Sequence, residues 1–292
     1  MCKSEIVQQK QVQHKAKYIG LVLSCLVTLS VICPSGVKAQ GNLLITPRRV
    51  VFDGTKRVHE LNLANTGRDT AKYNVSIVEY RMKEDGSFEE ITQPDPGQNF
   101  ADKNIRFFPR TVTLGPNEAQ VVKMQVTNTS KLAPGEYRSH VYFRAVPKQV
   151  ALGEEDKTLD STAVSVKLVP IFGITIPVII RVGESTTKVS LSDLKLEMVN
   201  DTTNRLDVTF NRIGNMSVYG DLKVVHVSPT GKETQVGVVN GIAVYTPNAI
   251  RRYRMDLDKE AVVDYHSGHL VVTYYAQSDI KPEKFAEAGL KL

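Results

Sequence analysis

The 292-residue sequence predicts an all-β protein in which two antiparallel β-sandwich domains follow an N-terminal signal peptide. Short segments of alternating polarity, separated by turn residues, recur along the chain after residue 40. No segment there keeps a helical 3.6-residue period for three turns, and the longest apolar stretch is rich in β-branched residues. The 253 residues after position 39 are enough for two domains of ordinary size.

Residues 1–39 are predicted to be the signal peptide. Four lysines precede an apolar run at 18–33, and the small-residue pattern at 37–39 suits cleavage before Gln40. Lipidation at Cys25 and retention of the segment as an anchor are the alternatives. Each alternative would change how the protein is attached to the membrane and would leave the folded domains unchanged. The sequence therefore predicts an exported protein.

Removal of this segment changes what composition implies about partners. It carries five lysines and one glutamate, so 32 of the 37 basic and 30 of the 31 acidic residues remain, with a net charge of +2. Nucleic-acid binding, which needs a concentrated basic field, therefore loses its support. All three cysteines also lie before Gln40, so core burial must hold the mature domains together without disulfides.

The first domain is predicted to span 40–183. Its strands end at turn signals such as Asp53-Gly54, and a polar loop at 147–161 precedes a long apolar run. We expect strands at 44–52, 58–64, 71–80, 105–114, 120–126 and 135–146.

The second domain is predicted to span 184–292 and to have the same rhythm of strands and turns. We expect strands at 188–191, 194–199, 205–211, 221–228, 236–244, 250–257 and 269–275.

The apolar run at 164–181 is long enough for a membrane helix, but its composition argues against one. Ten of its 18 residues are β-branched, Lys167 is charged, and Pro170 and Pro177 would interrupt a helix. We interpret it as extended chain and as the last strand of the first domain.

Short motifs in the sequence give no support for an enzyme. The pair His59-Glu60 lacks the second histidine of a zinc-protease helix, and the Ser-x-x-Lys spacing at 185–188 and 192–195 lacks its partner motifs. His266 and His269 straddle a turn without a clear third metal ligand. We therefore expect no catalysis and no cofactor, metal or small-molecule substrate.

Four segments together resemble the successive strands of PapD-like periplasmic pilus chaperones of the chaperone-usher pathway. They are 49–54, 60–65, 135–147 and 176–181, and their order and spacing match across 43–183. The resemblance implies two immunoglobulin-like sandwiches, a periplasmic location and a role in fimbrium assembly. Pilus subunits would be the partners, with an outer-membrane usher as a further candidate. The alternative is an exported adhesion or scaffold module with the same fold and no chaperone activity.

In this family the chaperone lends the last strand of its first domain to a subunit that lacks a strand, which is donor-strand complementation. At the matching place in this chain we expect one face of 164–172 to contact the partner, and 173–181 to be native core. An ordinary buried strand is the alternative, and an exposed strand would also permit self-association. The residues on the lent face would be Val164, Val166, Leu168, Pro170 and Phe172.

The resemblance also implies a basic pair that holds the carboxylate at the subunit's C-terminus. Arg49 matches the arginine of that pair, and a guanidinium bonds a carboxylate through two parallel hydrogen bonds. Pro177 occupies the position of the lysine, so Arg49 would act either alone or with a basic residue elsewhere that the sequence does not identify.

Glu136 and Arg181 match residues of an interdomain ion pair in the same family. The acidic partner from the second domain is expected near Gln277 or Asp279.

Overall fold

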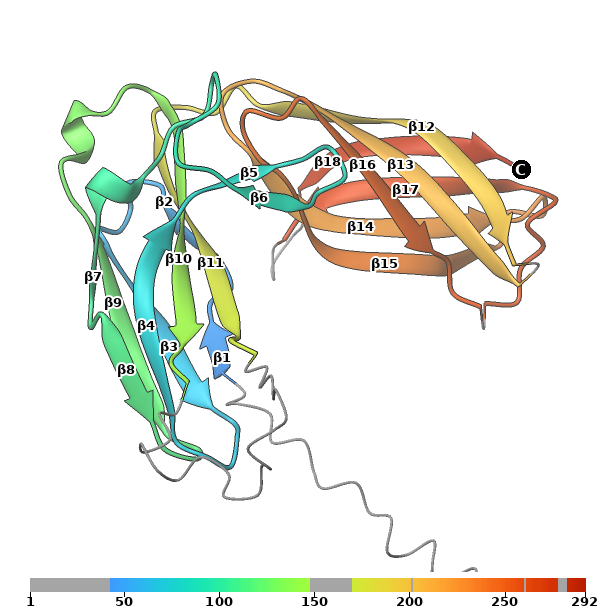
Figure 1. Ribbon diagram of the computed structural model, residues 1–292. Coiled ribbons are helices and arrows are strands. Elements are labelled where there is room, and N and C mark those ends of the chain that lie inside the picture. Colours follow the sequence, from blue (N-terminus) through green and yellow to red (C-terminus); the bar gives the residue numbers. More distant parts are fainter. Residues whose placement is uncertain (1–42, 148–169, 201, 260, 278–282) are drawn as a thin grey trace, which may run out of the picture. The chain divides into compact units, whose positions relative to one another are not determined.

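The computed structural model describes residues 43–147, 170–200, 202–259, 261–277 and 283–292 (Figure 1). The described residues belong to one compact unit. Within the described ranges the regular elements are strands and two short 3-10 helices, η1 (Asp102–Asn104) and η2 (Thr129–Lys131). None of the described helices could span a membrane. The prediction of an all-β fold with two sandwiches in tandem is confirmed.

The first sandwich consists of two sheets whose strand orders are β1-β3-β9-β7 and β2-β11-β10-β4-β8. Alternate side chains of both sheets point into a shared core that includes Leu61, Met124, Val141, Phe143 and Val178. The strands of the first sheet are β1 (Leu43–Thr46), β3 (Val58–Asn65), β9 (Ala119–Val126) and β7 (Ile105–Phe108). Those of the second are β2 (Val50–Phe52), β11 (Gly173–Val182), β10 (Gly135–Ala145), β4 (Ala71–Val78) and β8 (Thr111–Leu114).

Two predicted strands are each divided in two by a proline. The segment 44–52 becomes β1 and β2, which lie in opposite sheets on either side of Pro47, and 105–114 becomes β7 and β8 around Pro109. Proline lacks the N–H that a sheet ladder needs, so it marks the point where the chain changes sheets.

β2 also corrects the expectation of a purely antiparallel sandwich. Its three residues pair in parallel with Val178–Ile180 of β11. This pairing needs no local crossover, because β2 and β11 lie near opposite ends of the domain sequence.

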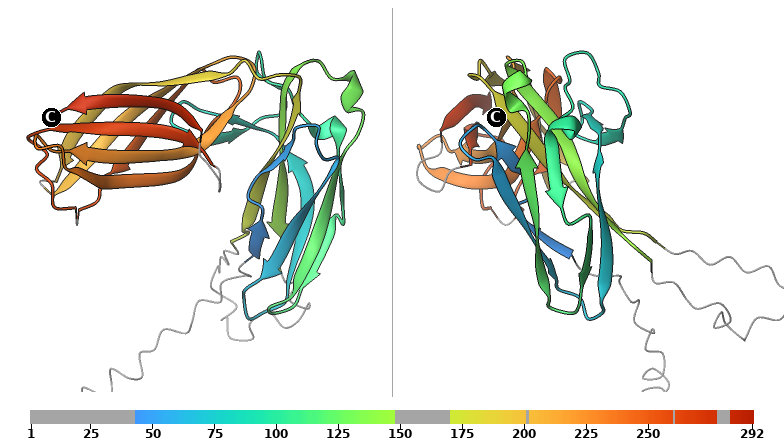
Figure 2. Two further views of the ribbon diagram at one scale, coloured as in Figure 1. Left: turned by 180° about the vertical axis from the view of Figure 1, so that it is seen from behind. Right: turned by 90° about the vertical axis from the view of Figure 1, so that its left-hand side faces the viewer.

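A hairpin of β5 (Tyr80–Met82) and β6 (Phe88–Glu90) follows β4 and projects out of its sandwich (Figures 1 and 2). Its tip is bonded to β16 of the second sandwich. The N–H of Arg252 donates to the Glu84 carbonyl at 2.6 Å, and the two side chains form an ion pair. Asn248 Nδ2 donates to the Met82 carbonyl at 2.7 Å.

The second sandwich packs the sheet β12-β13-β16 on the sheet β15-β14-β17-β18. Its core includes Leu206, Phe210, Val224, Val272 and Tyr274. The strands are β12 (Lys188–Val199), β13 (Thr203–Ile213), β16 (Ile250–Asp256), β15 (Glu233–Val244), β14 (Val218–Val227), β17 (His269–Ala276) and β18 (Lys284–Lys291).

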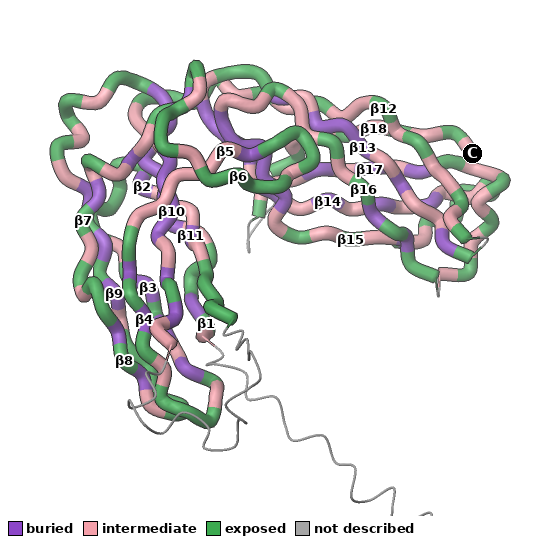
Figure 3. Tube along the Cα trace, in the orientation of Figure 1, coloured by how far each residue is buried: buried purple, intermediate pink, exposed green. Residues whose placement is uncertain are grey.

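A third, smaller apolar cluster contains residues of both sandwiches. Met82 and Ile179 from the first sandwich pack with Ala243 and Tyr245 from the second. In Figure 3, buried residues accordingly lie both in the core of the first sandwich and at the ends of strands in the second.

Candidate functional site

Arg49 lies between β1 and β2, and its guanidinium packs on aromatic rings from the second sandwich. Its Cζ lies 4.6 Å from the ring centroid of Tyr219 and 5.4 Å from that of Tyr245. Nη1 donates to the Tyr245 hydroxyl at 3.3 Å. Among the described residues no carboxylate forms an ion pair with Arg49. A positive charge held on ring faces, without a partner of opposite sign, is suited to bind an anion.

A pocket of about 350 Å³ opens beside this guanidinium. Its walls are mainly apolar or aromatic, and two arginines, Arg48 and Arg49, stand with them. The other walls include Tyr80, Phe88, His140, Pro177, Tyr219 and Tyr245.

A second cleft, of about 760 Å³, shares Arg49 with this pocket. Polar side chains line it more heavily, among them Arg181, Ser217, Lys188 and Gln277. Arg49 is therefore accessible from two hollows.

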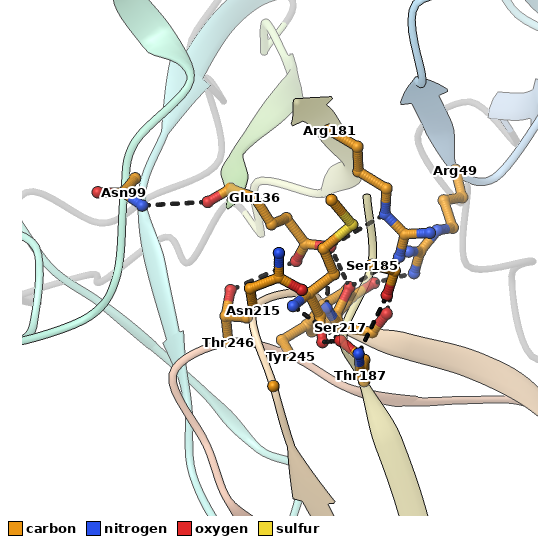
Figure 4. Close-up of polar contacts among 12 residues, drawn as sticks. Arg49, Asn99, Glu136, Arg181, Ser185, Thr187, Asn215, Ser217, Tyr245 and Thr246 are labelled. Carbon is orange, nitrogen blue, oxygen red and sulfur yellow. Dashed lines mark hydrogen bonds and ion pairs between the residues drawn. The ribbon is translucent and has the colours of Figure 1, made fainter. Parts of the chain in front are cut away.

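In the same region as Arg49, a buried carboxylate connects the two sandwiches through hydrogen bonds (Figure 4). Glu136 is 2% exposed, and its Oε2 accepts from Arg181 Nε at 3.2 Å and from the Ser217 N–H and Oγ at 3.0 and 2.7 Å. Its Oε1 accepts from Thr246 Oγ1 at 3.3 Å. Arg181 Nη2 also donates to the Ser217 carbonyl at 2.7 Å. Arg181 therefore balances the buried charge of Glu136, and both carboxylate oxygens accept hydrogen bonds.

Arg138 is a second buried cation next to this network. It is 2% exposed, its Cζ lies 4.4 Å from the Tyr245 ring centroid, and Nη2 donates to the Thr246 carbonyl at 3.2 Å. Burial lowers the pKa of Arg138, while Tyr245 and Glu136 act in the opposite direction. Its Nε and Nη1 have no partner among the described residues.

The structure brings together three of the predicted site residues. Arg49, Glu136 and Arg181 lie in one region, and the last two form an ion pair. The partner of Arg181 in the second sandwich is Ser217. Gln277, near which an acidic partner is expected, instead bonds Asp221 at 2.8 Å. Asp279 is outside the described residues.

The residues expected to contact a partner strand are only partly described. Val164, Val166 and Leu168 lie outside the described residues. Pro170 and Phe172 precede β11 and are exposed, and Phe172 exposes 55% of its surface. Pro177 lies within β11 opposite His140 and forms part of the apolar pocket wall.

Sequence reasoning missed the aromatic surroundings of Arg49. His140 alternates along β10 with the core residues Val141 and Phe143 and so lies on the outer face of the strand. That face is also buried, under the β5–β6 hairpin, whose Tyr80 and Phe88 pack on His140. Three polar residues in one strand that are all nearly inaccessible, Arg138, Ser139 and His140, form a pattern that only tertiary contacts could produce.

Comparison with known proteins gives matches to solved structures at low sequence identity. No protein-family model and no curated protein sequence matches the chain. The YadV chaperone is 13% identical with a TM-score of 0.42, and the match covers 86% of this chain and 99% of that one. A chain from the complex of the Salmonella enterica SafA pilin with the SafB chaperone is 13% identical with a TM-score of 0.40, covering 88% and 99%. The E. coli chaperone DraB is 11% identical with a TM-score of 0.40, covering 87% and 98%.

Proposed function

We propose that the protein is a periplasmic chaperone that binds fimbrial subunits by lending them the start of β11 and the residues before it. The observation behind this proposal is that one edge of β11 is paired along only part of its length. β2 pairs only with Val178–Ile180, and among the described strands none lies beside 173–177 on that side. An open strand edge can add a strand from another chain through backbone hydrogen bonds.

Backbone direction identifies the groups that the open edge offers. The N–H of Ala145 in β10 donates to the Phe172 carbonyl at 2.9 Å, so Phe172 directs its backbone groups towards β10. Because successive residues of a strand point to opposite sides, Ile171, Gly173 and Thr175 direct theirs towards the open edge.

The side chains along this edge are apolar and exposed. Ile171, Phe172 and Ile174 expose 43%, 55% and 36% of their surface. Large apolar side chains gathered at an unpaired edge are typical of an interaction surface. This extends the predicted contact segment, 164–172, into the first residues of β11.

Arg49 supplies the second element of the proposed interaction. Its guanidinium has no carboxylate partner among the described residues, and rings hold it in place. The resemblance to pilus chaperones assigns it the carboxylate at the end of the subunit. In our proposal the open edge aligns the subunit strand, and Arg49 fixes where that strand ends.

Co-purification tests the proposal. The full chain is co-expressed with the fimbrial subunits of its own bacterium, and captured subunit is measured after affinity purification from the periplasmic fraction. We expect Phe172→Asp combined with Ile174→Asp to abolish capture, because charges cannot enter an apolar subunit groove. Val238→Asp, at a 42%-exposed apolar site in β15, is the matched control and should retain it.

Each outcome of this experiment has a defined meaning. Equal capture by the double variant and the control would contradict the chaperone proposal and favour an adhesion or scaffold module. Circular dichroism of both proteins excludes loss of fold as the cause. The mass of the exported protein tests the predicted cleavage before Gln40 in the same preparation.

A further inference from the structure

Five aromatic rings line the pocket beside Arg49. Tyr219 packs on Arg49 itself, and the other four form a connected cluster whose members come from separate parts of the chain. Tyr80 and Phe88 belong to the β5–β6 hairpin, His140 to β10, and Tyr245 follows β15. Ring centroids lie 5.1 Å apart for Tyr80 and His140, 5.7 Å for Phe88 and His140, and 6.2 Å for Phe88 and Tyr245. The first two pairs meet edge to face. An additional ring could join such a cluster with the same favourable geometry.

His140 contributes a polar atom that the protein leaves without a partner. The residue is 3% exposed, and its Nδ1 forms no hydrogen bond among the described residues. Burial lowers the pKa of His140 to about 3, and Arg138 adds to this effect, so the ring is neutral at ordinary pH. A neutral His140 ring adds no charge to the pocket wall, so the positive charge there comes from the arginines.

The two arginines give the pocket its charge preference. Arg48 and Arg49 line the pocket, and its lining residues include no carboxylate. Pro177 contributes an apolar surface at the place where the resemblance calls for a lysine. The pocket thus presents positive charge to a ligand's acid group and rings to its side chain. This combination matches the chemistry of an aromatic carboxylate.

We propose that this pocket binds the last residue of the partner chain and selects an aromatic side chain there. The terminal carboxylate lies on Arg49, and the side chain packs among Tyr80, Phe88, His140 and Tyr245. The assignment of the ligand as a chain end rests on the proposed chaperone function. The selection of the side chain by the ring pocket goes beyond it, because a carboxylate anchor alone would accept any terminal residue.

The hairpin makes Phe88 a specificity-determining residue. Bonds from Arg252 and Asn248 of the second sandwich to the backbone at Glu84 and Met82 hold the hairpin. Phe88 nevertheless remains 47% exposed, so its ring is available to a ligand and its removal leaves the two cores intact.

Isothermal titration calorimetry with short peptides tests the selection. The protein is purified from cells that express the full chain, and the probe is acetyl-Gly-Ser-Gly-Ser-Phe with a free carboxylate. Matched probes end in Ala with a free carboxylate, end in Phe-amide, or consist of N-acetyl-phenylalanine alone. We expect the Ala and amide probes to bind at least about tenfold more weakly than the Phe acid, since a buried ring and a charged pair each contribute that much.

Two ring variants and one control locate the effect. Phe88→Ala and Tyr80→Ala should each reduce the preference for Phe over Ala to less than about threefold, because a wall of the pocket is lost. Phe108→Ala removes a 76%-exposed ring on β7 and should leave the preference unchanged. Thermal unfolding of each variant checks that it is folded.

Every result supports or overturns the proposal. Equal affinity for the Phe and Ala acids, or no measurable binding of any peptide, overturns the ring pocket, while subunit capture by the open edge is judged separately by co-purification. Binding of N-acetyl-phenylalanine as tight as that of the peptide overturns the assignment to a chain end and identifies a free aromatic carboxylate as the ligand. Preference lost equally in Phe108→Ala also overturns it.

Discussion

Glu79 should make the folded protein less stable as the pH rises from about 4.5 to about 7. The residue lies just after β4, its Oε1 accepts from Ser139 Oγ at 2.6 Å, and its Oε2 is buried without a partner among the described residues. Burial raises the pKa of Glu79 from 4.5 to about 7, with Asp102 adding to the effect and Ser139 and Arg138 opposing it. The unfolded chain therefore loses this proton at lower pH than the folded chain, and stability falls between pH 4.5 and about 7.

The size of the effect follows from that interval. About 2.5 pH units at ~1.36 kcal/mol each give about 3 kcal/mol, and partial exposure of the side chain reduces this to roughly 2–3 kcal/mol. Glu79→Gln carries no ionisable group and keeps an oxygen for Ser139. The free energy of unfolding of the Gln variant, relative to that of the wild type, should thus rise by that amount between pH 4.5 and pH 8.

Urea denaturation followed by circular dichroism at several pH values measures this difference. His140, whose burial lowers its pKa to about 3, destabilises both proteins as the pH falls below its ordinary value of 6.5, so its contribution cancels. The offset at pH 4.5 measures the cost of the amide itself. A difference that stays constant from pH 4.5 to pH 8 would refute the assignment of Glu79 as a buried acid.

Three further predictions concern stability. Glu136→Ala should cost about 2–4 kcal/mol in urea denaturation, because the arginine and the hydroxyls around the buried carboxylate lose their acceptor; a cost under 1 kcal/mol would contradict this. Gly214→Ala should lower the melting temperature more than Gly231→Ala, since both have positive φ (+96° and +82°) but only the first places a Cβ within 2.6 Å of other backbone; equal shifts would argue otherwise. Phe143→Ala should cost about 3–5 kcal/mol of unfolding free energy, whereas Phe108→Ala, at an exposed ring, should cost under about 1 kcal/mol.

The strands were predictable from sequence because most bury one face and expose the other. β3 follows this rule, with Leu61 and Leu63 buried between exposed residues. Local breaks were harder to locate. The predicted segments 188–191 and 194–199 are one strand, β12, because a bulge after Ser192 shifts the register without ending the pairing.

Two elements escaped prediction because their periodicity is weak or their segment is short. The β5–β6 hairpin has three-residue strands, and β6 shows no alternation because all three of its residues are exposed. β18 pairs with β17 at the sheet edge, where small residues such as Ala286, Ala288 and Gly289 leave little alternation.

In the candidate site, the sequence predicted only single residues whose neighbours in the chain resemble a family pattern. Arg49, Glu136 and Arg181 could be named in advance from the resemblance. The ring pocket could not, because Tyr80, Tyr219 and Tyr245 are distant in sequence and meet only through tertiary contacts. No local rule relates them.

Pro177 interrupts the row of hydrogen-bonding groups along the open edge of β11. Its odd-numbered position faces that edge, where it has no N–H to donate, and the pairing with β2 begins at Val178 immediately beyond it. An incoming strand that forms hydrogen bonds along the edge therefore meets an interruption before it reaches β2. In the proposed function, a partner strand would therefore pair with the part of β11 before Pro177, while Val178–Ile180 stay paired with β2 and keep the domain folded.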